Sequence, residues 1–367
     1  MILLHIVGAR PNFMKAAPVW RALANAGFHQ LIVHTGQHYD PNMSDVFFDQ
    51  LGMPRPDVNL EVGSGSHAQQ TALIMTRFEE VALSRRPDLV LVYGDVNSTV
   101  AAALVCAKLG VPVAHVEAGL RSFDRTMPEE INRLVTDQLA DLLFTPSEDG
   151  NRNLEREGIP ATKVHLVGNV MIDTLVRLIE HARPPKGVVM DGAFALVTLH
   201  RPSNVDDPES LKRIFAALEA LPGELRVIFP VHPRTRKRMA DLGLAVSDPE
   251  RFQLLEPIGY LEFLALQQRA RVVITDSGGI QEETTYLGVP CLTLRENTER
   301  PVTVELGTNV LIGRDMDLLR ACVEKILAGQ WKKGRVPPLW DGHASERIAG
   351  VLLEWCSARI QGGTRIG

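Results

Sequence analysis

The chain has 367 residues, 45% of them apolar and 23% charged, and 39 basic against 44 acidic residues leave a net charge of −5. This composition is typical of a globular protein with room for two domains, and it excludes a single small module. The charge argues against nucleic acid or an anionic membrane as a partner. No apolar run reaches the roughly 18 residues that would predict a membrane-spanning helix.

The first residues, MILLHIVGARPNFMK, lack a basic leader, so we expect no signal peptide. The four cysteines are scattered without a C-x-x-C pair, and they are Cys106, Cys291, Cys322 and Cys356. Such cysteines are expected to be small core residues in a reducing compartment rather than disulfide partners or zinc ligands. The sequence therefore predicts a cytoplasmic protein.

Short apolar runs alternate with segments of helical period in the first half of the chain. The runs predicted as buried strands are Leu3–Val7, Leu31–Thr35, Asp88–Tyr93, Val111–Val116 and Asp141–Thr145. The predicted helices are Met14–Ala26, Ala68–Arg85, Ser98–Leu109 and Pro128–Ala140. Continuous hydrophobicity in strands that are separated by helices predicts a parallel sheet covered on both faces.

The same pattern returns in the second half. Its predicted strands are Phe194–Leu199, Arg226–Val231, Phe252–Pro257, Arg271–Thr275 and Pro290–Leu294. We therefore expect two doubly wound, Rossmann-like α/β domains, 1–169 and 170–343, the second starting with a helix over Val170–Ala182. A final segment, 344–367, contains an amphipathic helix expected to pack back on the first domain. Open parallel sheets bind ligands beyond the carboxyl ends of their strands, so we expect the site in a cleft between the domains.

Charged side chains follow three predicted strands of the first domain. GARPNFMK brings Arg10 and Lys15, which can grip phosphate oxygens, while the following loops bring Asp95, Glu117 and Glu129. Simpler interpretations are a solvated basic turn, a helix cap at Asp95 and a favourable helix-dipole position at Glu129. However, a carboxylate at the end of a buried strand is costly unless it is paired or used, and here the loops after these strands deliver three carboxylates to one rim. This convergence favours acid–base chemistry.

Two loops of the second domain have the character of anion sites. His200 and Arg201 follow a strand and precede a helix-starting loop, a pattern that fits an anion site as well as a structural histidine. Ser277, Gly278 and Gly279 lie between a strand and a helix, where small residues let a diphosphate approach backbone amides. The alternative for this second loop is a tight glycine turn.

Acidic residues follow the glycine turn. Glu282 and Glu283 lie one helical turn further, where a carboxylate can accept hydrogen bonds from ribose hydroxyls, by analogy with dinucleotide sites. A later charged stretch, with Arg295, Glu299, Arg300 and Glu305, is most simply interpreted as solvated surface. GSGS at 63–66 lacks the third glycine of a dinucleotide fingerprint, and no P-loop, H-E-x-x-H or G-x-S-x-G motif occurs. We therefore expect no metal and no redox cofactor.

Several long motifs occur together in a fixed order: GARPNFMKAAPV, VYGDVNSTVAAA, HVEAGLRSFDRTMPEEINR, LVTLHRPSN, IFPVHPRTRKR and TDSGGIQEETTYLGVPCLTLRENTERPVTVELGTN. In these motifs the chain strongly resembles the non-hydrolysing UDP-N-acetylglucosamine 2-epimerases, from Ile2 to about Ile312. The resemblance implies a glycosyltransferase-B-like fold, a cytoplasmic homodimer that needs no cofactor, and supply of surface-polysaccharide precursors. It also implies anti elimination of UDP to 2-acetamidoglucal, followed by re-addition with the opposite configuration at carbon 2.

The resemblance also implies residue roles. Asp95, Glu117 and Glu129 match catalytic carboxylates, and His200 matches a catalytic-site histidine near the diphosphate. The residues implied to bind substrate are Arg10, Lys15, Phe263 (against the uridine), Ser277, Gly278, Gly279 and Glu283 (on the ribose). Arg201 and His232 match parts of an allosteric site for a second substrate molecule.

The chain departs from the family pattern in several places, one of them the QHYDPNM segment (37–43), which is two residues longer than the usual form. Asn12-Phe13 replaces a common Glu-Ala pair, and Asp40 and Gln69 stand where allosterically activated members have Gln and Arg. The same branch resembles epimerases acting on UDP-2,3-diacetamido-2,3-dideoxy-glucuronate, so the substituents at carbons 3 and 6 stay open. A UDP-sugar glycosyltransferase, a sugar-nucleotide sensor and a hydrolysing epimerase are the remaining alternatives.

Overall fold

The computed structural model describes residues 1–37, 50–188 and 190–361, while the side chains of Arg10, Ile360 and Gln361 lie outside the description. The chain divides into two compact units. Unit 1 comprises Met1–Thr174 and Pro338–Gly367, and unit 2 comprises Leu175–Pro337. Each unit is a parallel sheet with helices on both faces, so the predicted pair of Rossmann-like domains is confirmed.

Unit 1 is built on a seven-stranded sheet with the order β3-β2-β1-β4-β5-β6-β7, in which every pairing is parallel. Its strands are β1 (Ile2–Val7), β2 (His29–His34), β3 (Val58–Asn59), β4 (Leu89–Tyr93), β5 (Val113–Val116), β6 (Leu142–Thr145) and β7 (Val164–Leu166). Its helices are α1 (Arg10–Asn25), α3 (His67–Arg85), α4 (Asn97–Leu109), α5 (Pro128–Leu139), α6 (Glu148–Arg156), the start of α7 (Val170–Leu178) and α15 (Ala344–Gln361).

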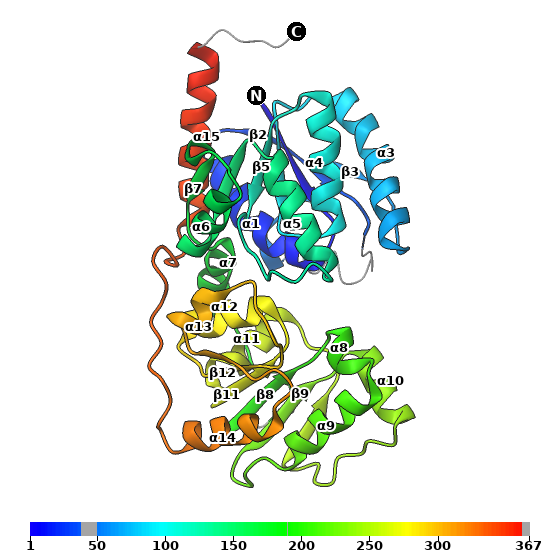
Figure 1. The fold of residues 1–367 in the computed structure, drawn as a ribbon, viewed down its shortest axis with the longest axis vertical. Coiled ribbons are helices and arrows are strands. Elements are labelled where there is room, and N and C mark those ends of the chain that lie inside the picture. The colour runs from blue at the N-terminus through cyan, green and yellow to red at the C-terminus, as the bar shows by residue number, and fades with distance from the viewer. Residues whose placement is uncertain (38–49, 189, 362–367) are drawn as a thin grey trace. The chain divides into compact units, whose positions relative to one another are not determined.

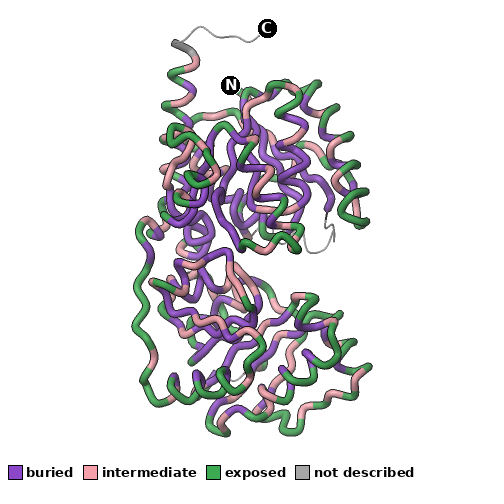
Figure 2. The backbone as a smooth tube through the Cα atoms, in the orientation of Figure 1, coloured by how far each residue is buried: buried purple, intermediate pink, exposed green. Residues whose placement is uncertain are grey.

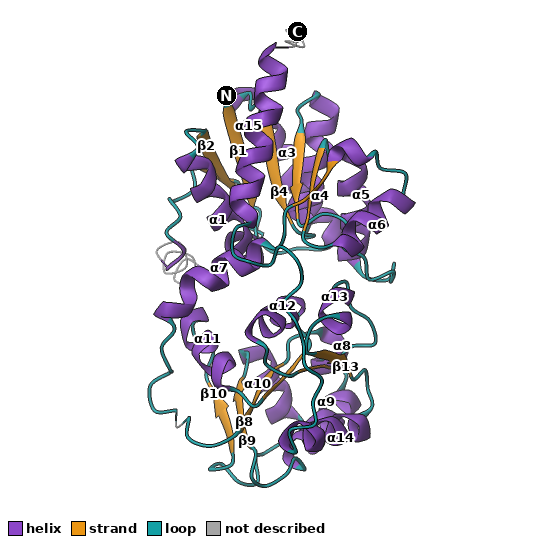
Figure 3. Ribbon diagram, turned by 90° about the vertical axis from the view of Figure 1, so that its left-hand side faces the viewer, coloured by secondary structure: helices purple, strands orange, loops and turns teal. Residues whose placement is uncertain are grey.

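Alternation along the strands divides the core of unit 1 between the two faces of the sheet. Leu4 and Ile6 of β1 pack with Ile74 and Phe78 of α3, because successive strand residues point to opposite faces. α3, α4 and α5 lie side by side on this face, and α1 packs with α15 on the other (Figures 1 and 3). Buried stretches follow the strands in Figure 2.

Unit 2 is built on a six-stranded parallel sheet with the order β10-β9-β8-β11-β12-β13. Its strands are β8 (Phe194–Thr198), β9 (Arg226–Pro230), β10 (Phe252–Leu255), β11 (Val272–Thr275), β12 (Cys291–Thr293) and β13 (Asn309–Leu311). Its helices are α8 (Pro202–Val205), α9 (Pro208–Glu219), α10 (Pro233–Asp241), α11 (Tyr260–Arg269), α12 (Gly278–Leu287), α13 (Pro301–Glu305) and α14 (Met316–Leu327).

Two separate clusters form the core of unit 2. Ala195 and Val197 of β8 belong to a cluster that α9 and α14 cover. Phe194 and Leu196 of the same strand belong to a second cluster, which contains Leu266 of α11. Both faces of the sheet are therefore buried, which explains the continuous rather than alternating hydrophobicity of these strands.

The final helix belongs to unit 1. α15 packs against α1, and the Asp173 carboxylate accepts hydrogen bonds from the first backbone amides of α15, those of Ala344 (3.1 Å) and Ser345 (2.7 Å). Trp340, 2% exposed, donates its indole N–H to the carbonyl of Pro146 at 2.9 Å. These contacts explain why the compact units divide at 174/175 and 337/338 rather than at the predicted 169/170 and 343/344.

All ten strands expected from the sequence are present, with ends that differ by at most two residues. Three short edge or near-edge strands, β3, β7 and β13, were not predicted. Each has two or three residues and carries no strong hydrophobic run. The four cysteines are buried and free, as expected for core residues. Within the described part of the chain, no helix combines the length and apolar character needed to cross a membrane.

Candidate functional site

A buried ion pair lies at the carboxyl end of β5. Glu117 follows β5 directly with a φ of 75°, and its carboxylate accepts a hydrogen bond from Lys15 Nζ of α1. A Cβ on Gly94, which follows β4, would lie 2.7 Å from Lys15 Nζ and 3.1 Å from Glu117 Oε2. A glycine is therefore required here, and the ion pair sits directly beside the turn that carries Asp95.

Asp95 is held by an arginine of α5. Arg133 donates from Nη2 (2.6 Å) and Nε (3.0 Å) to Asp95 Oδ2. The N-cap of α4 is Val96, without a side-chain cap, so the simpler interpretation of Asp95 as a helix cap is wrong. Arg133 also bonds Glu130 Oε2 at 2.6 Å, and Glu130 accepts backbone amides from the preceding loop. Glu130 is thus occupied in holding this loop and Arg133.

Asp95 and Glu129 line one pocket. The pocket has a volume of about 270 Å³ and lies within unit 1. Its wall consists of Gln37, Ser64, Gly65, His67, Gln70, Asp95, Val96, Asn97, Pro128, Glu129 and Asn132. Most of these side chains are polar, and several bond one another: Asn97 donates to Gln70 Oε1 at 2.8 Å, and Asn132 donates to the carbonyl of Asp95 at 2.8 Å. A fixed polar wall therefore surrounds the two carboxylates.

The three carboxylates singled out from the sequence thus meet at one end of the unit 1 sheet. Asp95 and Glu129 share the pocket, and Glu117 lies beside Gly94, the residue before Asp95. Of the two predicted cations, Lys15 pairs with Glu117, whereas the side chain of Arg10, the first residue of α1, lies outside the described atoms. Such a group of held carboxylates can exchange protons with a bound substrate.

In unit 2, His200 is tied to the glycine turn through Asp276. The buried Asp276 carboxylate lies 2.9 Å from His200 Nδ1 and accepts the backbone amides of His200 and Arg201 at 3.0–3.1 Å. Burial alone would raise the pKa of Asp276, but the hydrogen bonds from His200, Arg201 and Asn204 outweigh it and lower that pKa below 3.8. Asp276 thus orients the His200 ring through Nδ1, while the side chain is half exposed to solvent.

The glycine turn begins α12. Ser277 is the N-cap of this helix and makes no side-chain cap bond of its own, and backbone amides at the start of a helix can bind an anion. A Cβ on Gly278 would lie 2.5 Å from Arg300 Nη1 and 2.8 Å from Glu299 Oε1. Gly278 is therefore fixed by close packing, while Gly279 follows in the first turn of the helix.

Buried ion pairs pack behind this turn. Arg300 pairs with Glu282 (2.8 Å) and Glu299, and Glu299 pairs with Arg295 at 2.7 Å. Arg295, Glu299 and Arg300 are at most 7% exposed, so the interpretation of this stretch as solvated surface is wrong for these three residues. Each charge finds an opposite charge inside the unit, which offsets the cost of burial. Glu305 is exposed, as expected.

Two further predicted nucleotide contacts lie on α11 and α12. Glu283 is buried, and its Oε1 accepts a hydrogen bond from the hydroxyl of Tyr260 at 2.8 Å. Phe263, one turn after Tyr260, is half-buried and packs against the cluster that contains Leu266. The assignments of Glu283 to a ribose and of Phe263 to a uridine stay predictions.

Arg201 and His232, the residues matched to an allosteric site, are in unit 2, whereas Gln69 is in unit 1. Arg201 donates from Nε to the carbonyl of Asp276 at 3.1 Å. His232 is the exposed N-cap of α10, and its Nδ1 accepts the amide of Arg234 at 3.3 Å. Gln69 forms a capping box with Ser66 at the start of α3, which gives this glutamine a structural reason. Asp40 lies outside the described residues.

Sequence reasoning missed three polar residues that support the site. Asn12 accepts the amides of Gly8 (3.1 Å) and Ala9 (3.0 Å) and donates to the carbonyl of Tyr93 at 2.9 Å. Asp276 orients His200, and His115 bonds Asp137 at 2.6 Å inside unit 1. For His115 and Asp276 the available signal was a polar residue within or directly after an apolar strand, such as the histidine in VPVAHV.

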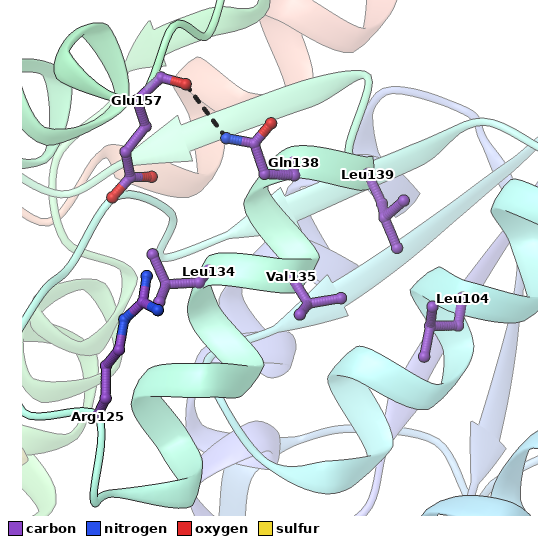
Figure 4. A pocket seen from close by; sticks show the side chains of 7 residues that line it. All are labelled: Leu104, Arg125, Leu134, Val135, Gln138, Leu139 and Glu157. Carbon is purple, nitrogen blue, oxygen red and sulfur yellow. Dashed lines mark hydrogen bonds between the residues drawn. The ribbon is translucent and has the colours of Figure 1, made fainter.

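A second pocket lies away from these groups. It has a volume of about 480 Å³ between α4 and α5, and Figure 4 shows its lining of Leu104, Arg125, Leu134, Val135, Gln138, Leu139 and Glu157. Most of this wall is apolar, and it carries none of the three candidate carboxylates. Its chemistry suits contact with another apolar surface rather than proton transfer.

Two Rossmann-like units with charged groups at the carboxyl ends of parallel strands are the architecture of the glycosyltransferase-B-like fold class. The model of one family, UDP-N-acetylglucosamine 2-epimerase, matches residues 21–353. The chain belongs to this family, whose members are isomerases.

Named relatives support the same assignment. The chain is 44% identical over 367 residues to the UDP-N-acetylglucosamine 2-epimerase of Methanocaldococcus jannaschii, covering 96% of this chain and 99% of the relative. It is also 44% identical over 358 residues to the UDP-2,3-diacetamido-2,3-dideoxy-D-glucuronate 2-epimerase of Pseudomonas aeruginosa, covering 96% and 100%. The crystal structure of the Methanocaldococcus jannaschii enzyme with UDP-GlcNAc and UDP superposes with a TM-score of 0.87, covering 96% and 100%.

Proposed function

We propose that this protein interconverts UDP-N-acetylglucosamine and UDP-N-acetylmannosamine by inverting carbon 2. Family membership supports the reaction class, and the observation that carries the mechanism is the meeting of Asp95, Glu117 and Glu129 at one end of the unit 1 sheet. The proposed steps are anti elimination of UDP to 2-acetamidoglucal and re-addition of UDP with the opposite configuration at carbon 2.

The chemistry explains why charged groups of both signs are needed. The proton on carbon 2 is weakly acidic, so cleavage of the anomeric bond runs ahead and builds positive charge on the sugar. Carboxylates stabilise this charge and carry protons, and opposite faces of the sugar require at least two such groups. We assign these roles to Asp95, Glu117 and Glu129.

We assign binding of the departing diphosphate to cations and to the glycine turn. Ser277, Gly278 and Gly279 offer the uncapped start of α12, and His200 is oriented beside this turn by Asp276. Negative charge grows on the diphosphate as the anomeric bond breaks, so Arg10 and Lys15 contribute most in the transition state. The placing of Glu283 and Phe263 on the nucleoside belongs to the same proposal.

The proposal extends to the setting of the enzyme. We infer a cytoplasmic homodimer that supplies precursors of surface polysaccharides, and the apolar groove between α4 and α5 supports contact between copies. Light scattering of Val135→Glu against wild type tests the dimer. A mass unchanged by this substitution contradicts an interface at the groove.

A second candidate substrate is UDP-2,3-diacetamido-2,3-dideoxy-glucuronate, because a 2-epimerase of this sugar is 44% identical to the chain. The deciding experiment incubates the enzyme with each UDP-sugar in D2O and follows carbon 2 by NMR. Deuterium at carbon 2 without an acceptor supports the epimerase. Sugar transfer that requires an acceptor indicates a glycosyltransferase, and free N-acetylmannosamine as the main product indicates a hydrolysing enzyme.

A further inference from the structure

A single buried histidine contacts all the segments that carry the three carboxylates. His115 of β5 is fully buried, and it lies two residues before Glu117. Its Nε2 is 2.8 Å from the carbonyl oxygen of Gly94, the residue before Asp95. Its Nδ1 is 2.6 Å from Oδ1 of Asp137 in α5, the helix whose first turn holds Glu129.

Both ring nitrogens of His115 face acceptors. A backbone carbonyl can only accept a hydrogen bond, and an ionised carboxylate also only accepts. Asp137 Oδ2 faces two groups that can only donate, the guanidinium of Arg121 at 2.7 Å and the backbone amide of Gly119 at 3.1 Å, and these contacts stabilise Asp137 as a carboxylate. A ring with one proton would therefore point a lone pair at one of these oxygens. The geometry requires a proton on each ring nitrogen.

The charges around His115 balance when the ring carries two protons. Asp137 Oδ2 lies 2.7 Å from Arg121 Nη2 and accepts the amide of Gly119 at 3.1 Å. Arg121 in turn forms two hydrogen bonds with Glu157, both within 2.8 Å. The carboxylates of Glu157 and Asp137 then alternate with the cations of Arg121 and His115, and the Gly94 carbonyl follows His115. Paired charges of this kind are tolerated inside a protein, whereas an unpaired one is costly.

We propose that doubly protonated His115 is the positioning residue that sets the mutual geometry of Asp95, Glu117 and Glu129. It grips the turn before Asp95 through Gly94, holds α5 through Asp137, and belongs to the strand that leads into Glu117. The ring itself is buried behind these groups and acts through them. The inference rests on the proposed function, because displaced carboxylates matter only if they act together on one substrate.

Two substitutions separate the two contacts. In His115→Gln the amide nitrogen replaces Nε2 and can still donate to the Gly94 carbonyl, while the bond to Asp137 is lost. In His115→Asn the amide nitrogen replaces Nδ1 and can donate to Asp137, while the Gly94 carbonyl loses its donor. The matched control is His5→Gln, because His5 is also a fully buried histidine of the same sheet but bonds Tyr93 and Gln30.

We expect both His115 variants to lower kcat by about 100-fold with little change in KM, since misplacement by about 1 Å costs this much. His5→Gln should lose stability but keep kcat per folded molecule within about twofold of wild type, because a purely structural histidine does not set the carboxylates. If kcat of the two His115 variants also stays within about threefold of wild type per folded molecule, the proposal is wrong.

Two measurements keep the inference separate from the proposed function and from folding of the variants. Neutron diffraction of the wild-type protein should show deuterons on both nitrogens of His115, and a single deuteron overturns the proposal. The crystal structure of His115→Asn should show the Gly94–Asp95 turn displaced, and an unmoved turn also overturns it. Failure of the wild-type enzyme to exchange deuterium at carbon 2 refutes the proposed function. The two measurements above still decide whether the His115 ring carries two protons and whether it positions the Gly94–Asp95 turn.

Discussion

The carboxyl ends of the two sheets present different kinds of candidate group, although the two units have similar folds. In unit 1 the candidate groups are side chains, and other side chains hold them: Arg133 holds Asp95 and Lys15 holds Glu117. In unit 2 the candidate group is the backbone at the start of α12, and the ion pairs of Arg300 lie behind it. Proton transfer needs side chains fixed in place, whereas diphosphate binding needs amides left open.

The largest expected effect breaks the unit 1 side of this comparison. Glu117→Gln and Asp95→Asn should each lower kcat by about 10³-fold, because each removes a charge or a proton carrier with little change in volume. Deuterium exchange at carbon 2 measures the rate, and circular dichroism checks the fold. Glu79→Gln, which alters an exposed carboxylate of α3, is the control and should keep normal turnover. Near-normal rates in both test variants would remove the carboxylate assignment.

A pH titration sharpens the comparison, because a buried histidine of unit 1 and a buried carboxylate of unit 2 titrate in different ranges. Burial lowers the pKa of His5 in unit 1 from 6.5 to about 4, so the unfolded chain binds a proton there first. Stability of unit 1 should therefore fall by about 3 kcal/mol as pH drops from 6.5 to about 4. The contribution of Asp276 to unit 2 is present above its unfolded value of 3.8 and is lost only below it.

Hydrogen exchange of β1 and β8 peptides at pH 7 and pH 4.5 measures this difference. Protection should fall in β1 and change less in β8. His5→Gln, which cannot titrate, should flatten the response of β1. Equal loss of protection in both strands, unchanged by His5→Gln, would contradict the assignment of the pH-dependent loss of stability to His5.

The unit 2 side is tested at the glycine turn. Gly278→Ala should weaken UDP binding by about 30-fold, about 2 kcal/mol, because the new methyl group meets Arg300 and Glu299, which buried ion pairs keep from moving aside. Isothermal titration calorimetry with UDP gives the affinity. Gly223→Ala is the matched control, since a Cβ there meets no atom within 4 Å. Equal affinities for the two variants would rule out a diphosphate at this turn.

The last expected effect is on stability alone and concerns Asn12, which joins the β1–α1 turn to the end of β4. Asn12→Ala leaves the carbonyl of Tyr93 and two amides without this partner and should lower the free energy of unfolding by about 1–3 kcal/mol. Asn12→Asp keeps the acceptor but loses the donor, so its loss should be smaller. Urea denaturation measures both. If Asn12→Ala leaves the free energy of unfolding unchanged, water replaces the three hydrogen bonds of the Asn12 side chain.

The sequence was sufficient for ten of the strands and for the convergence of three carboxylates at one end of a sheet, because apolar runs and strand-end acids are local patterns. It was insufficient for charges that are paired over long distances along the chain. Arg300 looked like surface because nothing in its own segment shows that Glu282 of α12 lies beside it. His115 and Asp137 are 22 residues apart, and only the folded β5–α5 connection shows that they meet.

The return of the chain to unit 1 after Pro337 makes unit 2 an insertion within unit 1. During synthesis, all of unit 2 therefore leaves the ribosome before α15. Until then α1 lacks the helix that packs against it in the folded protein. The late segment supplies Trp340, Ile348 and Leu352, each at most 2% exposed in the folded protein. A chain stopped before residue 338 would leave the face of α1 uncovered, so unit 1 matures last although its first strand is made first.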